Sequence, residues 1–85
     1  MPYHVEFAPS AARQFRKLQP AVRDRVAARI DLLADNPRPH GVEKLEGADA
    51  LYRVRVGDFR IVYEIHDKKL VVLVVRIADR KDVYR

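Results

Sequence analysis

Cysteine is absent from this 85-residue sequence, and glycine occurs only three times. Without cysteine, neither a disulfide framework nor a thiolate metal site can support a small core. The sequence also contains no glycine-rich phosphate loop, nucleophile elbow or zinc motif. Its histidines, His4, His40 and His66, show no metal-ligand spacing. We therefore expect a protein that uses neither a metal nor another cofactor.

Long apolar segments are missing as well. The longest strongly apolar run, from Leu70 to Val75, is far shorter than the roughly 20 residues needed to span a bilayer. Residues 1–7 have neither the basic region nor the apolar stretch of a secretory signal. These features predict a cytoplasmic protein with no membrane partner.

The composition predicts one folded domain that comprises residues 1–85. Hydrophobic residues make up 48% of the chain and charged residues 34%, a balance typical of globular proteins. The net charge is +5, and the region from Ala50 onward carries most of it, with nine basic and five acidic residues. Arginine dominates the cations, and its planar guanidinium suits phosphate oxygens. An anionic partner such as nucleic acid is the favoured interpretation.

The first half of the sequence predicts one short strand and two helices. Apolar and polar residues alternate from Tyr3 to Phe7, as in a half-buried strand. Apolar residues at helical spacing predict helices from about Ser10 to Leu18 and from about Pro20 to Asp35. Because the connection is so short, the helices should form an antiparallel hairpin that buries a shared apolar stripe on a sheet. Residues 37–49 are expected to be an irregular loop.

The second half predicts a three-stranded antiparallel meander. Apolar and polar residues alternate on both sides of Gly57-Asp58, a two-residue hairpin signal. A turn at residues 67–69 leads to a third strand, Leu70 to Ile77, whose two apolar faces predict a place inside the sheet. The predicted fold class is therefore α+β, in the order β-α-α-β-β-β, with the sheet packed on the helices.

The hairpin register brings arginines together on the face of the sheet away from the helices. A two-residue turn pairs Val56 with Phe59, which places Arg55 opposite Arg60 and Arg53 two residues away. Like charges directly opposite each other cost on the order of a few tenths to 1 kcal/mol. A bound anion such as an RNA or DNA phosphate would offset this repulsion.

The third strand is expected to extend the same face. If the preceding turn has three residues, Arg76 lies beside Arg60, and Val62, Val72 and Val74 form an apolar floor. The alternative is a solvated outer face on which each arginine pairs with a nearby carboxylate. The carboxylates available for this alternative are Asp58, Glu64 and Asp79.

Four segments of the sequence resemble the RelE/ParE superfamily of bacterial toxins, and most closely its RelE branch. They are Leu45-Glu46-Gly47, Leu51 to Tyr63, Arg76 to Arg80 and Asp82 to Arg85. The most specific of them is the pattern Tyr-Arg-x-Arg-x-Gly-Asp-Phe-Arg-x-x-Tyr. The resemblance covers nearly the whole chain, because the predicted order of strands and helices matches too.

This resemblance implies a toxin of a type II toxin–antitoxin system that cleaves mRNA in the ribosomal A site, in contact with ribosomal RNA. A small acidic antitoxin encoded beside it would hold it inactive. The implied reaction is attack of a ribose 2′-hydroxyl on the adjacent phosphate with loss of the 5′-oxygen. The catalytic positions of the family fall here on Arg53, Arg55, Arg60, Arg80 and Tyr84. Further RNA contacts are expected from Arg76, Lys81 and Arg85.

The chain departs from the family pattern at the first two sheet positions. The pattern has lysines there, and a lysine of lowered pKa can act as general base, whereas this chain has Arg53 and Arg55. Arginine keeps its proton in proteins and is a poor base. Two other functions stay open: a ParE-like inhibitor of DNA gyrase, and a catalytically inactive regulatory binding module.

Overall fold

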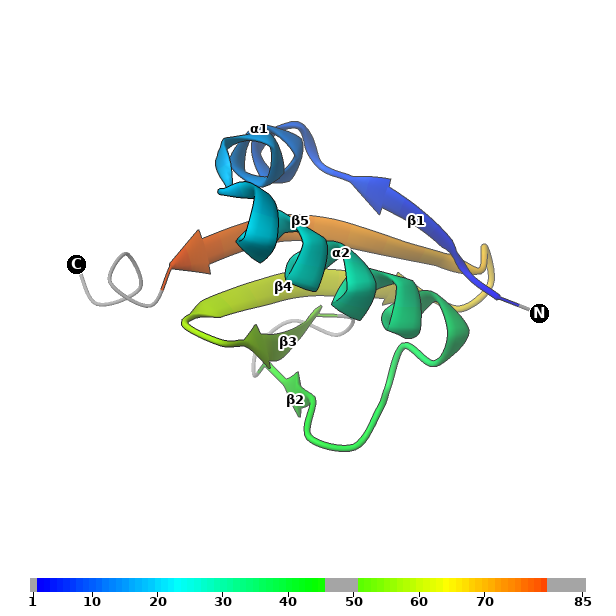
Figure 1. Ribbon diagram of the computed structural model, residues 1–85. Coiled ribbons are helices and arrows are strands. Elements are labelled where there is room, and N and C mark those ends of the chain that lie inside the picture. The colour runs from blue at the N-terminus through cyan, green and yellow to red at the C-terminus, as the bar shows by residue number, and fades with distance from the viewer. Residues whose placement is uncertain (1, 46–50, 80–85) are drawn as a thin grey trace.

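A five-stranded sheet carries two helices on one face (Figure 1) in the computed structural model, which describes residues 2–45 and 51–79. The strands lie in the order β1-β5-β4-β3-β2, and only β1 and β5 are parallel. The elements are β1 (His4–Phe7), α1 (Pro9–Lys17), α2 (Pro20–Asp35), β2 (Glu43–Lys44), β3 (Leu51–Val56), β4 (Phe59–His66) and β5 (Val71–Asp79). The predicted α+β class is confirmed.

Both helices begin at a proline, and α2 has the predicted bounds. Proline suits the first helical turn because that turn has no use for the missing N–H and the ring fixes a helical φ. α1 begins at Pro9, one residue before the predicted start. It packs mainly on β5, whereas α2 lies against β1, β3 and β5. The α2 stripe Val26, Ile30 and Leu33 is buried.

Tyr63 lies at the centre of the core and ties the loop after α2 to the sheet. The side chain is fully buried, and its ring stacks on Tyr52 with the centroids 5.9 Å apart. The Tyr63 hydroxyl donates a 2.8 Å hydrogen bond to the Pro37 carbonyl. Burial raises the pKa of Tyr63 to about 12, so the hydroxyl keeps the proton that it donates.

A cluster of polar side chains joins the β4–β5 turn to the loop after α2 and to the N-terminal segment. Arg38 binds Asp67 through two hydrogen bonds of 3.1 and 2.9 Å, and the Tyr3 hydroxyl donates a third at 2.7 Å. The Arg38 guanidinium also donates to the Tyr52 hydroxyl at 3.2 Å. Hydrogen bonds from Arg38 and Tyr3 lower the pKa of Asp67 to about 2. We call Tyr3, Arg38 and Asp67 the turn cluster.

The loop predicted for residues 37–49 is wrong at Glu43 and Lys44, which form β2. Glu43 pairs with Arg53, and Lys44 pairs with Tyr52. The Leu45 N–H extends the ladder by donating to the Leu51 carbonyl at 2.9 Å. This short strand is the edge strand of the sheet and lies next to β3, which carries Arg53 and Arg55.

The predicted register is confirmed for β3 and β4, including Arg55 opposite Arg60. The register predicted for β5 is wrong for two reasons. The turn has four residues, Asp67 to Leu70, and Val75 forms a β-bulge, because Tyr63 pairs with Val74 while Val62 pairs with Arg76. The longer turn moves the first half of β5 by one residue, and the bulge moves its second half by one more.

Two consequences follow for the face away from the helices. Val72 and Val74 are fully buried on the helix side, opposite Ile65 and Tyr63, so the predicted apolar floor of Val62, Val72 and Val74 does not form. Arg76 stays on the outer face, but it lies opposite Val62, and Ala78 takes the place beside Arg60.

Candidate nucleic-acid interface

Three predicted site residues converge on the outer face of the sheet. Arg53 and Arg55 extend from β3 and Arg60 from β4, because alternate residues of a strand share a face and the β3–β4 register sets Arg55 opposite Arg60. We call these three residues the arginine cluster. Their strand neighbours Tyr52, Val54 and Ile61 are buried, so the packing of the core fixes which way the arginines face.

A cavity of about 260 Å³ opens between the arginine cluster and the loop that leads into β2. It is lined by Gly41, Glu43, Arg53, Arg55 and Arg60. Three guanidinium groups and one carboxylate leave this cavity with a net positive charge. Guanidinium groups bind phosphate oxygens through paired, charge-assisted hydrogen bonds, so the cavity can accept a phosphate group.

One member of the arginine cluster is already paired. Arg53 Nη2 donates a 2.6 Å hydrogen bond to Glu43 Oε2 across the β2–β3 ladder. This hydrogen bond and the charge of Arg53, with a smaller contribution from Arg60, lower the pKa of Glu43. Within residues 2–45 and 51–79, Arg55 and Arg60 form no ion pair of their own. Their charges remain available to an anion.

The alternative of a solvated face with paired arginines is therefore met only for Arg53, whose partner Glu43 is not one of the three candidate carboxylates. Glu64, one of its candidates, bonds instead to His66 at 2.8 Å. Glu43 was missed because it lay in the predicted loop, and a two-residue strand is too short to show a period of two. Only the backbone pairing of β2 with β3 reveals that Glu43 faces Arg53.

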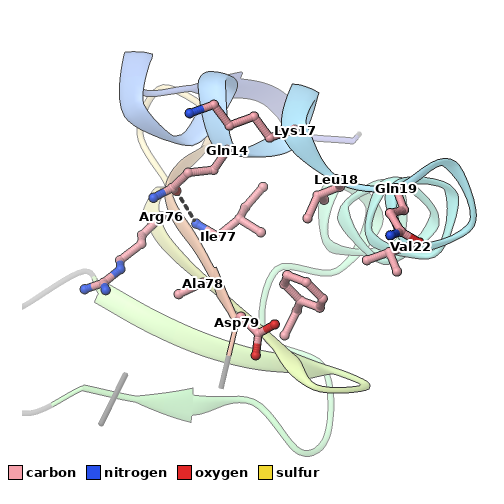
Figure 2. Close-up of a pocket in the computed structure, with 10 residues that line it drawn as sticks. Gln14, Lys17, Leu18, Gln19, Val22, Arg76, Ile77, Ala78 and Asp79 are labelled. Atoms are coloured by element: carbon pink, nitrogen blue, oxygen red, sulfur yellow. Dashed lines mark hydrogen bonds between the residues drawn. The ribbon is translucent and has the colours of Figure 1, made fainter. Parts of the chain in front are cut away.

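Arg76, predicted as an RNA contact, is exposed on the outer face but does not line the arginine cavity. It lies at the margin of a larger groove of about 450 Å³ between α1, the start of α2 and the end of β5. Figure 2 shows the Arg76 guanidinium pointing away from Leu18 and Val22, the apolar residues on the helical side. In this groove the Gln14 side chain accepts the Ile77 N–H at 2.8 Å. The groove is mainly apolar and holds none of the arginine cluster.

The other predicted site residues, Arg80, Lys81, Tyr84 and Arg85, lie outside the described residues. In the described part of the chain, no group of histidine and carboxylate side chains could hold a metal ion. No helix in that part is long and apolar enough to cross a membrane.

Comparison with known proteins identifies the family. Residues 5–84 match the family described as "ParE toxin of type II toxin-antitoxin system, parDE". The chain belongs to this toxin family.

Two relatives of this ParE-family toxin carry RelE names. It is 30% identical over 88 residues to "mRNA interferase toxin RelE" of Escherichia coli K12, a match that covers 99% of this chain and 92% of the relative. It is 33% identical over 88 residues to "Toxin RelE" of Mycobacterium tuberculosis, covering 99% of this chain and 88% of the relative.

Solved structures agree with these matches. The toxin superposes on isolated E. coli RelE with a TM-score of 0.83 at 29% identity, covering 96% of this chain and 90% of that one. It superposes on a chain of the intact E. coli RelBE toxin–antitoxin complex with a TM-score of 0.82 at 28% identity, covering 91% of this chain and 95% of that one. The fold and the family are therefore those of RelE-like toxins.

Proposed function

We propose that this toxin is a ribosome-dependent mRNA endonuclease that inhibits translation in the cytoplasm. The observation that carries the proposal is the cavity in which Arg53, Arg55 and Arg60 converge on the outer face of the sheet. The name of its E. coli K12 relative, an mRNA interferase, supports the same activity. Opposed arginines destabilise the free sheet, and a bound RNA phosphate would offset their repulsion.

The proposed reaction is an intramolecular transesterification. The ribose 2′-oxygen forms a bond to the adjacent phosphorus, the bond from phosphorus to the 5′-oxygen breaks, and the products carry a 2′,3′-cyclic phosphate and a 5′-hydroxyl. Arg60 stabilises the negative charge that builds on the phosphate oxygens, and Arg53 and Arg55 hold the phosphate in place. We assign Arg80 to the leaving oxygen and Tyr84 to stacking on the nucleotide. Arg76, Lys81 and Arg85 bind the RNA backbone in the A site.

The proposed protein partner is an acidic antitoxin. E. coli RelE is seen in an intact RelBE complex, which supports a partner of this kind. The net charge of +5 suits an acidic chain that folds on the toxin surface. Such a partner would hold the toxin inactive by covering or displacing its active elements.

The test is to induce the toxin in cells without its antitoxin and to map mRNA 5′ ends. We expect new 5′-hydroxyl ends within translated codons, and we expect Arg60→Ala to abolish them. Arg13→Ala is the matched control, because Arg13 is an exposed arginine on α1, in the helical layer. Circular dichroism of both variants checks that the fold persists.

Two other outcomes would overturn the proposal. Intact mRNA with arrested DNA replication would favour inhibition of DNA gyrase, the alternative suggested by the ParE name of the family. Intact mRNA with normal growth would favour a regulatory binding module without catalysis.

A further inference from the structure

We propose that Glu43 is the general base of this reaction, an assignment that rests on the proposed function. The 2′-hydroxyl must lose its proton as its oxygen attacks phosphorus, and the arginine cluster offers no group that can accept it. Arginine stays protonated at every physiological pH. Among the described residues that line the cavity, Glu43 has the only side chain that is ionised as a base at neutral pH and can accept a proton from a hydroxyl group.

The position of Glu43 is set by backbone pairing. β2 places Glu43 directly opposite Arg53, and the Leu45 N–H continues the ladder to the Leu51 carbonyl. The carboxylate therefore lies at one wall of the cavity whose other walls include Arg55 and Arg60. A phosphate bound by these arginines would bring its ribose within reach of Glu43.

The state of the Glu43 carboxylate suits a base. Its hydrogen bond from Arg53 lowers the pKa, so the carboxylate is ionised at neutral pH and can accept a proton, although it is a weaker base than an unpaired glutamate. Arg53 binds Oε2, which leaves Oε1 free to accept a hydrogen bond from a 2′-hydroxyl. The Glu43 side chain is 65% exposed, so the described part of the chain leaves it accessible to RNA.

The proton balance is complete with water as the only further reactant. The 2′-hydroxyl proton moves to Glu43 as the bond from the 2′-oxygen to phosphorus forms. A water molecule protonates the departing 5′-oxygen, and the hydroxide left behind takes the proton from Glu43. The enzyme is thereby returned to its starting state.

A competing role for Glu43 predicts the opposite result. If the carboxylate only neutralises Arg53 in the free toxin, its removal frees a cation for phosphate and strengthens RNA binding. Cleavage by Glu43→Gln would then be as fast as in the wild type, or faster. A base, in contrast, contributes to the rate of the bound complex, and general bases supply about 10²- to 10⁴-fold.

The experiment is single-turnover cleavage of mRNA on purified ribosomes with saturating toxin. For Glu43→Gln we expect a rate at least about 100-fold lower, with half-saturation at the wild-type toxin concentration or below. Glu64→Gln is the matched control, because it removes the same charge from the same face of the sheet, outside the cavity, and should keep the wild-type rate.

Glu43→His gives a readout that a structural role would not produce. Imidazole has a pKa of about 6.5, so cleavage by this variant should rise with pH between about 5.5 and 7, where the wild-type rate is flat. Wild-type rates in Glu43→Gln, or a loss confined to binding, would overturn the assignment while the endonuclease proposal stands. Intact mRNA with the wild-type toxin would instead overturn the endonuclease proposal, and the assignment with it.

Discussion

Gly57 allows the turn that brings Arg55 and Arg60 together. Its φ is +57°, in the left-handed region that side chains rarely adopt, and a Cβ there would lie 3.2 Å from Arg25 Nη2. The backbone conformation therefore favours glycine, whereas the exposed and flexible Arg25 side chain can move away from a Cβ.

We expect Gly57→Ala to destabilise the fold by about 1 kcal/mol, because alanine carries the cost of the left-handed conformation. The measurement is urea unfolding followed by circular dichroism. Asp58→Ala, at the other turn residue, is the control, and it should change stability by less than about 0.5 kcal/mol. Equal midpoints for the two variants would contradict this account of the turn.

Individual site residues were predictable where the register decided their positions. Arg53, Arg55 and Arg60 lie on strands whose alternation and two-residue turn leave one pairing, and the structure has that pairing. Glu43 was not predictable, because its place depends on backbone hydrogen bonds between segments that sequence periodicity does not relate. The presence of arginine instead of lysine at positions 53 and 55 predicted only that the site lacks an evident general base.

The turn cluster links three elements through one carboxylate, and its strength depends on pH. The pKa of Asp67 is about 2 in the folded protein against 3.8 as the ordinary value. Because the folded pKa is the lower one, the cluster contributes stability above about pH 4 and loses it as the pH falls toward 2. The side chains are about half exposed, so we expect a modest effect.

Asp67→Asn should therefore lower the melting temperature at pH 6, and the difference from the wild type should shrink as the pH falls from 4 to 2. Thermal unfolding at a series of pH values measures this difference. Glu6→Gln on β1, whose carboxylate makes no hydrogen bond in the described part of the chain, is the control. A difference that stayed constant down to pH 2 would show that the charge of Asp67 is not what stabilises the turn.

Elements with a periodic pattern of apolar residues were predictable, including the four-residue β1, and elements without one were not. The apolar stripe of α2 and its flanking prolines gave its bounds to the residue. β2 has two residues, and the bulge at Val75 is a single extra residue in an apolar strand, so neither leaves a periodic signal. Both faces of β5 are apolar, so its sequence does not show which face is buried. The packing of the helices decides this, because Val72 and Val74 join Tyr63 in the core.

The molecule as a whole has helices on one face of its sheet and the arginine cluster on the other, with a net charge of +5. RNA that binds the arginine face should release counterions, so its affinity should fall as salt rises. For the whole protein we expect the logarithm of the RNA affinity to fall linearly with the logarithm of the salt concentration.

Arg55→Gln should make this slope shallower by about 0.7, the value for one phosphate contact with a single strand. Arg13→Gln, on the helical layer, should leave the slope unchanged. Fluorescence anisotropy with a labelled single-stranded RNA at several KCl concentrations measures both slopes. An equal decrease of the slope in the two variants would mean that RNA binds both faces of the molecule and does not prefer the arginine cluster.

The bulge at Val75 also divides β5 into two stretches of opposite mutational tolerance. Before it, even-numbered residues such as Val72 and Val74 face the core, whereas after it the odd-numbered Ile77 does and Arg76 faces outward. A scan that places lysine at Val72, Val74, Arg76 and Ile77, read out by the yield of folded protein, should be intolerant at the even-numbered Val72 and Val74 and then at the odd-numbered Ile77, but tolerant at Arg76. This change of phase within one strand keeps Ile77 in the core while Arg76 faces outward, toward the surface proposed to bind RNA.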